Sequence, residues 1–259
     1  MSRFYALCLM GVGTVLAAAQ VAGAAGAVTL TGMQPYWPLH GGCGPTAAGM
    51  VIGYWDDHGY PNLITGGDGT NSWSSNQAAI QDVIASQEHF DDYYGTDAAS
   101  PHADNCIADF MLASRDPLGD GFSYANKQDE GLRGYAAYVG YTNTGSDFKY
   151  YAQNLWTLLV SEINAGRPME FYVDTNGNND PDHFVAVFGY DDTLGAEQYA
   201  CYTGYDAAPH WLDFKPVADG QLYGVSTGTW FNPTPEPATL AFLGAGTAWL
   251  ALRRRPGRR

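Results

Sequence analysis

A glycine-rich turn that runs into an apolar helix constrains this chain most. In the stretch from His40 to Pro45, glycines lie on both sides of a single cysteine, Cys43. Pro45 suits the first turn of a helix, where its missing N–H and fixed φ carry no cost. Apolar residues then recur at helical spacing, at Ala47, Ala48, Val51, Ile52 and Trp55. Cys43 is therefore predicted at the N-terminus of a helix with one buried face.

That position favours a nucleophile. The unpaired N–H groups and the positive end of the helix dipole stabilise a thiolate, so a cysteine there titrates lower and reacts faster. A second interpretation is a small buried cysteine packed in a glycine-rich turn, because free cysteine is among the most buried residue types. This stretch alone leaves both interpretations open.

Both ends of the chain carry signals. Arg3, the apolar run 4–19 and small residues up to Ala27 predict a secretory signal peptide over residues 1–27, so the body is expected to be exported. Residues 233–259 contain a Pro-Glu-Pro motif, an apolar segment at 240–252 and a terminal arginine cluster. This order predicts a membrane stop-transfer segment, although it is shorter than the roughly 20 residues of a stable span.

The segment between the signals, residues 28–232, is long enough for one domain with a full core. Of the 12 Lys and Arg residues, six lie in the two signals, whereas only one of the 27 Asp and Glu residues does. The body is therefore strongly acidic. Such a charge repels phosphates and excludes a nucleic-acid partner, while it is compatible with basic substrates, cation binding or simple solubility.

Three cysteines remain in the body. An odd count in an oxidising compartment suggests one pair and one free thiol, and Cys43 has a chemical reason to stay free. Cys106 and Cys201 are then the candidates for a disulfide, although nothing in the sequence places them close together.

The order of predicted elements indicates an α+β fold. Helices are expected over 43–55, 76–90, 104–111, 130–138 and 154–164, and strands over 169–173, 183–190, 197–202 and 222–231. His58–Ser75 is expected to be a loop. A helical half followed by an antiparallel sheet leaves a cleft where the two meet.

A cysteine nucleophile needs a base, usually a histidine distant in sequence. His183 is the best candidate because it begins the strand 183–190, whereas His58, His89, His102 and His210 are expected in polar loops or helix ends and His40 shares the Cys43 loop. A third residue should orient the imidazole. If the strands from His183 and Glu197 are adjacent and antiparallel, Asp206 meets His183. Asp182 and Asp213 are weaker candidates.

These motifs resemble the papain-like cysteine peptidases related to the bacteriocin leader-processing family. The resemblance rests on Gly42–Ala48, on Ile163–Pro168 before a strand, and on His183–Asp192. It implies a papain-like fold, with Cys43 on a helical lobe and His183 on an antiparallel sheet lobe. It further implies a catalytic pair of Cys43 and His183, completed by Asp206, with Gln34 in the oxyanion hole. The segment Asn62–Asp129 is an insertion relative to the simple family pattern, so substrate choice does not carry over.

The C-terminal segment resembles the PEP-CTERM sorting signal of Gram-negative envelope proteins. The resemblance implies that an exosortase recognises and removes the tail, which holds the protein at the membrane until then. The implied location is the cell envelope or the extracellular matrix.

One loop is a candidate calcium site. Asp174, Asn176, Asn178 and Asp180 place oxygens at alternate positions, as at the start of a calcium loop. Asn179 stands where such loops prefer glycine, and no glutamate closes the ring, so a polar β-turn is the other interpretation. No other cofactor is expected.

The sequence thus predicts an exported papain-like cysteine peptidase that acts on a peptide or protein. Two alternatives stay open. One is another amide acyl transfer on the same site, such as transpeptidation or cell-wall amide hydrolysis, and the other is a surface or matrix protein that keeps the fold without catalysis.

Overall fold

The computed structural model describes residues 26–67, 70–95, 98–195 and 197–233. Almost all of the predicted leader and of the C-terminal signal therefore lies outside the described residues. Within the described part, no helix is both long and apolar enough to cross a membrane.

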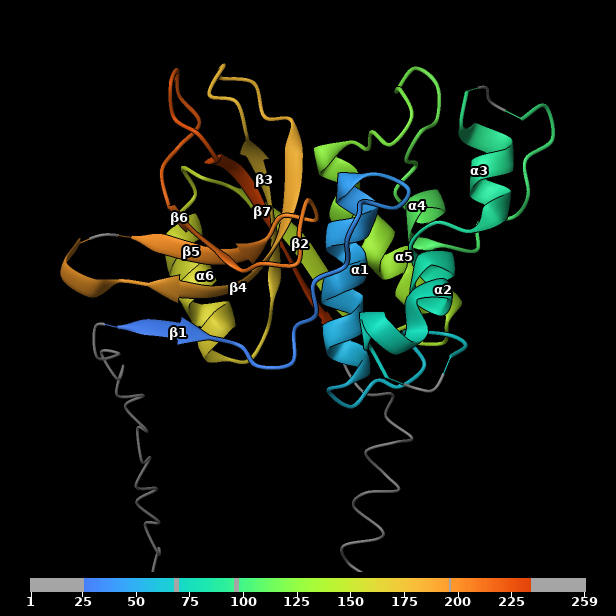
Figure 1. Cartoon of the computed structure of the whole chain (residues 1–259), viewed down its shortest axis with the longest axis horizontal. Helices are drawn as coiled ribbons and strands as arrows, with labels where there is room; N and C mark the ends of the chain where they lie inside the picture. The colour runs from blue at the N-terminus through green and yellow to red at the C-terminus, as the bar shows by residue number, and fades with distance from the viewer. Residues whose placement is uncertain (1–25, 68–69, 96–97, 196, 234–259) are drawn as a thin grey trace, which may run out of the picture.

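A helical half and an antiparallel sheet stand side by side (Figure 1). The helical half holds α1 (Cys43–Asp56), α2 (Trp73–Ile84), α3 (Gln87–Tyr93), α4 (Ile107–Phe110) and α5 (Gln128–Tyr138). The sheet half holds β2 (Thr144–Tyr150), α6 (Leu155–Asn164), β3 (Met169–Asp174), β4 (His183–Asp191), β5 (Gln198–Tyr202), β6 (His210–Asp213) and β7 (Gly224–Pro233). The α+β arrangement predicted from the sequence, with the cysteine on a helix and the histidine on the sheet, is confirmed.

The strand order is β2-β7-β3-β4-β5-β6, and β1 (Ala27–Thr29) pairs with β4. All these pairings are antiparallel. The central strand β4 is buried along nearly its whole length because both faces of the sheet are covered. Phe184, Ala186 and Phe188 join the core beneath α1, whereas Val185 and Val187 join the core that contains α6. His183 thus begins a strand that both cores hold in place.

The structure changes some predicted boundaries. The single helix expected over 76–90 is two helices, because Ala85 is extended (φ −152°, ψ 111°) and Ser86 caps a new helix by accepting from the His89 N–H. The helix expected from 104 begins at Ile107, with Cys106 rather than Asp104 as its N-cap. The predicted loop 58–75 ends when α2 begins at Trp73. The strands β1, β2 and β6 were not predicted.

Cys106 and Cys201 do not form a disulfide. Both are free and fully buried, Cys106 in the core of the helical half and Cys201 in the core of the sheet half. The prediction of a pair is wrong because the two cysteines belong to different cores.

Candidate active site

Cys43 is the first residue of α1, as predicted. Its N-cap, Gly42, has φ 112° and ψ 171°, a conformation that L side chains rarely adopt. The following helix is buried over nearly its whole length, which fixes the direction of its N-terminus. Cys43 itself is only partly buried. The first N–H groups of a helix have no intrahelical partner, so they are available to an anion beside the sulfur.

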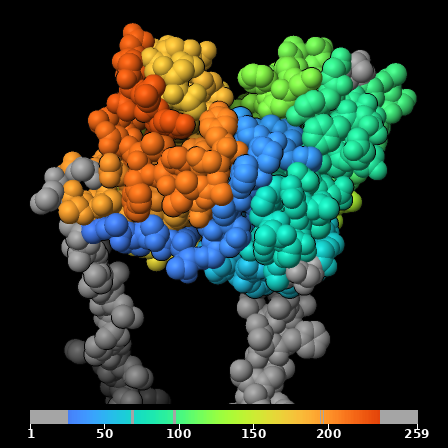
Figure 2. Space-filling view, viewed as in Figure 1, coloured from blue at the N-terminus to red at the C-terminus, as the bar shows by residue number. Residues whose placement is uncertain are grey.

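Cys43 and His183 line one cavity of about 450 Å³. Its wall combines the turn before α1, the end of α3, the loop around Gly121 and the start of β4. In Figure 2 the sheet half, in orange and yellow, and most of the helical half, in teal and green, lie on either side of blue residues near the N-terminus of the described chain. The lining residues are Leu39, His40, Gly41, Gly42, Cys43, Phe90, Tyr94, Asp120, Gly121, Phe122, Asp182, His183 and Tyr205.

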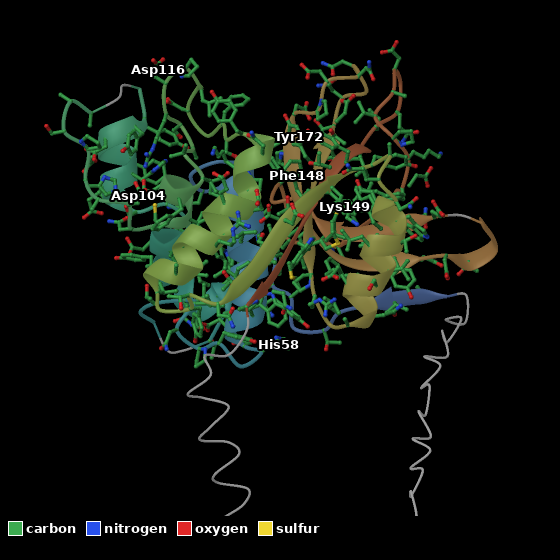
Figure 3. All side chains as sticks on the ribbon, turned by 180° about the vertical axis from the view of Figure 1, so that it is seen from behind. His58, Asp104, Asp116, Phe148, Lys149 and Tyr172 are labelled. Atoms are coloured by element: carbon green, nitrogen blue, oxygen red, sulfur yellow. The ribbon has the colours of Figure 1, made fainter. Side chains whose placement is uncertain are left out.

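The imidazole of His183 is held by the backbone. His183 is 2% exposed, and its Nε2 lies 2.7 Å from the carbonyl oxygen of Thr203, the residue after β5. A carbonyl only accepts, so Nε2 carries the proton and Nδ1 has the free lone pair. The chain entering β4 is anchored by Tyr172 (Figure 3), which stacks on Phe184 at 4.5 Å between ring centroids and whose hydroxyl donates to the Pro181 carbonyl.

Tyr205 covers the imidazole. Its ring stacks on His183 with centroids 4.3 Å apart, and its hydroxyl lies 3.1 Å from Nδ1. Burial raises the pKa of Tyr205 to about 12, so the hydroxyl is neutral and donates to Nδ1. Tyr205 therefore occupies the nitrogen that a catalytic base needs free.

Burial moves the pKa values of Cys43 and His183 in opposite directions. It raises the pKa of the Cys43 thiol, and the backbone amides of Phe184, Gly44 and Cys43 lower it only in part. Burial also lowers the pKa of His183, against the opposing effects of the Thr203 carbonyl and of Asp182. Both shifts favour the uncharged forms, a thiol and a neutral imidazole, over an ion pair. The expectation that a cysteine at the helix N-terminus titrates lower does not hold for Cys43, because desolvation outweighs the effect of the N–H groups.

Asp206 is not at the imidazole. Its carboxylate is half exposed and binds His210 Nε2 at 3.0 Å and the Ala208 N–H at 2.9 Å. The strands β4 and β5 are adjacent and antiparallel as predicted. However, the chain turns at Gly204 (φ 75°), so Thr203 faces His183 and Asp206 lies further along, toward β6. Asp213, one of the two weaker candidates, binds Lys215 and Gln198.

The structure places the remaining candidates as follows. Gln34 is partly buried and is not among the residues that line the cavity, so its place in an oxyanion hole stays a prediction. Asp182 does line the cavity and accepts from Thr175 and Asn176. His40 also lines it, with Nε2 2.9 Å from the Ala85 carbonyl.

The candidate calcium loop is ordered by its own backbone. Asp174 Oδ1 accepts from the N–H groups of Asn176 and Gly177, and its Oδ2 accepts from Asn179. Asn176 and Asn178 accept in the same way from the residues two positions later. These contacts are those of a polar turn. Calcium binding by Asp174, Asn176, Asn178 and Asp180 stays a prediction.

Sequence reasoning missed Thr203, Tyr205 and the aromatic wall formed by Phe90, Tyr94 and Phe122. A backbone carbonyl leaves no signature in a sequence. The aromatic residues did leave a signal in the sequence, because Phe90 and Tyr94 are four positions apart and so fall on one face of a helix. However, nothing in the sequence placed the insertion that carries them beside Cys43.

The comparison with protein families agrees with this geometry. No curated protein matches. One matching solved structure is that of the active wild-type Prevotella intermedia interpain A cysteine protease, with 14% sequence identity over 79% of this chain and 94% of that chain and a TM-score of 0.48. The model of the Peptidase_C39 like family matches residues 30–206, which include Cys43 and His183. Since the match covers well over half of the 259 residues, the chain belongs to the Peptidase_C39 like family.

Proposed function

We propose that the protein is an exported cysteine peptidase in which Cys43 is the nucleophile and His183 the general base. The observation that carries the proposal is that both residues line one cavity while the Thr203 carbonyl holds the imidazole with Nδ1 unprotonated. The Tyr205 hydroxyl, which donates to Nδ1, has to move aside before this nitrogen can accept the thiol proton. The third member of the unit is then a backbone carbonyl rather than the predicted Asp206. The substrate is a peptide or protein, as the family membership suggests.

The reaction starts from the neutral pair. As Sγ attacks the peptide carbonyl carbon, the thiol proton moves to Nδ1 of His183 and the S–C bond forms. The N–H groups at the start of α1 stabilise the oxyanion. Collapse breaks the C–N bond, and Nδ1–H protonates the leaving amine. Water, deprotonated by the same imidazole, then hydrolyses the thioester and restores the thiol.

Paired substitutions test these roles. Cys43→Ala should abolish cleavage of a denatured protein substrate, whereas Cys201→Ala, at another free cysteine far from the cavity, should retain it. His183→Ala should lower the rate about 10²–10⁴-fold, the usual contribution of general acid–base catalysis. Asp206→Asn should change it less than twofold. A large loss at Asp206 would restore the Cys-His-Asp triad.

The same variants separate the alternatives. A protein that transfers the acyl group to an added amine rather than to water is a transpeptidase or related acyl transferase. If Cys43 reacts with iodoacetamide no faster in the parent protein than in His183→Ala, His183 does not activate Cys43, and the non-catalytic interpretation holds.

Export and sorting form the second part of the proposal. The N-terminal leader is removed on export, and an exosortase removes the tail after about Pro237, as the two signals in the sequence suggest. Before that cleavage the apolar segment 240–252 holds the protein at the membrane of a Gram-negative cell. The mass of the intact native protein tests this, since a mass that includes the arginine cluster contradicts tail removal.

A further inference from the structure

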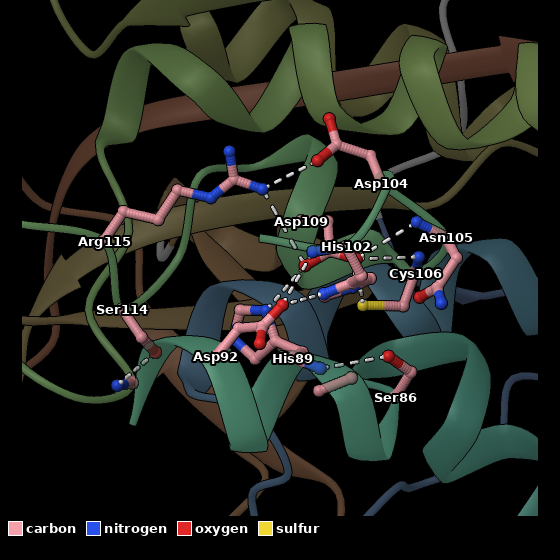
Figure 4. Close-up of polar contacts among 12 residues, drawn as sticks. Ser86, His89, Asp92, His102, Asp104, Asn105, Cys106, Asp109, Ser114 and Arg115 are labelled. Carbon is pink, nitrogen blue, oxygen red and sulfur yellow. Dashed lines mark hydrogen bonds and ion pairs between the residues drawn. The ribbon is translucent and has the colours of Figure 1, made fainter. Parts of the chain in front are cut away.

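A second cluster of reactive side chains lies inside the Asn62–Asp129 insertion (Figure 4). His89 comes from α3, and Cys106 and Asp109 come from the start of α4. All three are 0% exposed, and one ligand-type atom of each lies within 4.8 Å of the others. His102, from the connecting loop, joins them with Nε2 3.0 Å from Asp109 Oδ2. The sequence suggested polar loops or helix ends for both histidines.

The spacing of these atoms suits a metal ion. His89 Nδ1 lies 2.8 Å from Asp109 Oδ1, and Cys106 Sγ lies 3.2 Å from Asp109 Oδ2. In a tetrahedral zinc site with bonds of about 2.0–2.3 Å, neighbouring ligand atoms are about 3.3–3.8 Å apart. The His89–Asp109 and Cys106–Asp109 contacts would each need to lengthen by about 0.5 Å to admit the ion.

His102 is already oriented as a ligand. Its Nδ1 lies 2.5 Å from Asp92 Oδ2, and Asp92 also accepts from the His102 N–H at 2.8 Å. A carboxylate that accepts from one imidazole nitrogen presents the lone pair of the other, which is the usual outer-shell support of a zinc-bound histidine. With Nδ1 protonated, Nε2 can face the Asp109 carboxylate only if it holds an additional proton or a cation.

Hydrogen bonds alone leave the cluster incompletely satisfied. Within the part of the chain that the structure describes, His89 Nε2 and Asn105 Oδ1 are buried atoms that can offer a lone pair and have no hydrogen-bond partner. Buried polar groups are nearly always paired, so these two lone pairs near Asp109 need an explanation. Arg115 Nη2 lies 3.8 Å from Asp109 Oδ1, so this carboxylate already has one cationic neighbour. A metal ion would offset the further negative charge of a Cys106 thiolate.

We propose that His89, His102, Cys106 and Asp109 bind one divalent transition-metal ion, with zinc the best match to two imidazoles, a thiolate and a carboxylate. Four protein ligands with no open position make this a structural site. It links α3, the following loop and α4. Phe90 and Tyr94, which line the Cys43 cavity, flank His89 on and just after α3, so the ion would fix one wall of that cavity.

Binding requires loss of the thiol proton. Without metal, burial and the nearby Asp109 raise the pKa of Cys106 to about 12, so the ion displaces a proton when it binds. Metal affinity should therefore increase with pH across the neutral range.

Cobalt(II) is a direct probe of the site. The full chain carrying Cys43→Ala, which removes the more accessible thiol, is titrated with Co²⁺, and zinc content is measured by mass spectrometry after equilibration. We expect about one ion per chain, the visible bands of tetrahedral cobalt, and a near-ultraviolet thiolate-to-cobalt charge-transfer band. Cys106→Ser should abolish the charge-transfer band, and the matched variant Cys201→Ser should retain it.

Asp92→Asn keeps all four ligands and alters only their support, and its side chain is partly exposed, so the variant should fold. It should weaken binding about 10–100-fold. If Cys106→Ser does not fold, the Asp92→Asn titration decides. Absence of the charge-transfer band in the parent protein, the same cobalt spectrum in Cys106→Ser, or unchanged affinity in Asp92→Asn would each overturn the proposal and leave a hydrogen-bonded cluster.

Discussion

Gly42→Ala tests whether the N-terminus of α1 is fixed by close packing against the opposite cavity wall. A Cβ at this position would lie 2.0 Å from the carbonyl oxygen of Gly121 and 2.8 Å from its carbon. These are backbone atoms, which cannot move aside as a flexible side chain can. Gly42 also has φ 112°, so alanine is strained there before any clash is counted.

Gly59→Ala is the matched control. Gly59 has φ 101°, and its added Cβ would meet nothing within 4 Å. Both variants therefore lose about 1–3 kcal/mol to backbone strain. Gly42→Ala should lose a further ~1–3 kcal/mol, the typical cost of overpacking. At about 2–4 °C per kcal/mol for a domain of this size, Gly42→Ala should melt about 2–12 °C below Gly59→Ala.

Urea and thermal unfolding measure the two losses, and alkylation of Cys43 reports on the cavity. Displacing Gly121 moves the cavity wall, so Gly42→Ala should change the alkylation rate of Cys43 while Gly59→Ala should not. Equal melting temperatures in the two variants, with equal alkylation rates, would refute the close contact between Gly42 and Gly121.

Three further predictions concern the site and the loop before it. Because burial lowers the pKa of His183 and raises that of Cys43, the acid limb of the pH profile of kcat/KM should lie below pH 6.5. Asp182→Asn should move this limb to still lower pH, because the Asp182 carboxylate raises the His183 pKa, and an unmoved limb contradicts this. Tyr205→Phe removes the hydroxyl that donates to His183 Nδ1. Since a hydrogen bond contributes ~0.5–1.5 kcal/mol, alkylation of Cys43 should become up to about tenfold faster, whereas a slower reaction would show that the hydroxyl assists Cys43 and His183. If the 174–180 loop binds calcium, millimolar Ca²⁺ should raise the melting temperature and Asn178→Ala should reduce the rise, while equal curves with Ca²⁺ and with chelator return the loop to a polar turn.

The sequence predicts the elements that carry strong periodicity. The α1 helix and the strand β4 appear close to their expected bounds, because an apolar face and a continuous apolar run are local signals. The strand β2 was missed, since Thr144–Tyr150 is only partly buried and shows no clear alternation. Within the site, Cys43 and His183 were found from residue type and position.

The neighbours of that pair depend on tertiary structure. Asp206 was chosen because β4 and β5 are adjacent, and they are, but the turn at Gly204 decides which residue faces the imidazole. The extended Ala85 breaks the predicted helix, and its carbonyl then contacts His40. Neither outcome follows from composition or spacing, because each depends on a single backbone conformation fixed by distant contacts.

Because a backbone carbonyl orients His183, single substitutions cannot remove this hydrogen-bond acceptor. An aspartate or asparagine in that role can be removed by one base change, whereas every residue at position 203 supplies a carbonyl. The Thr203 carbonyl is held in place by the pairing of β4 with β5, and the irregularity between Val187 and Gly189 sets the register of that pairing. An insertion or deletion in the β4–β5 hairpin should therefore damage the imidazole's orientation more than any substitution at Thr203, and relatives with very different side chains there can share the same support.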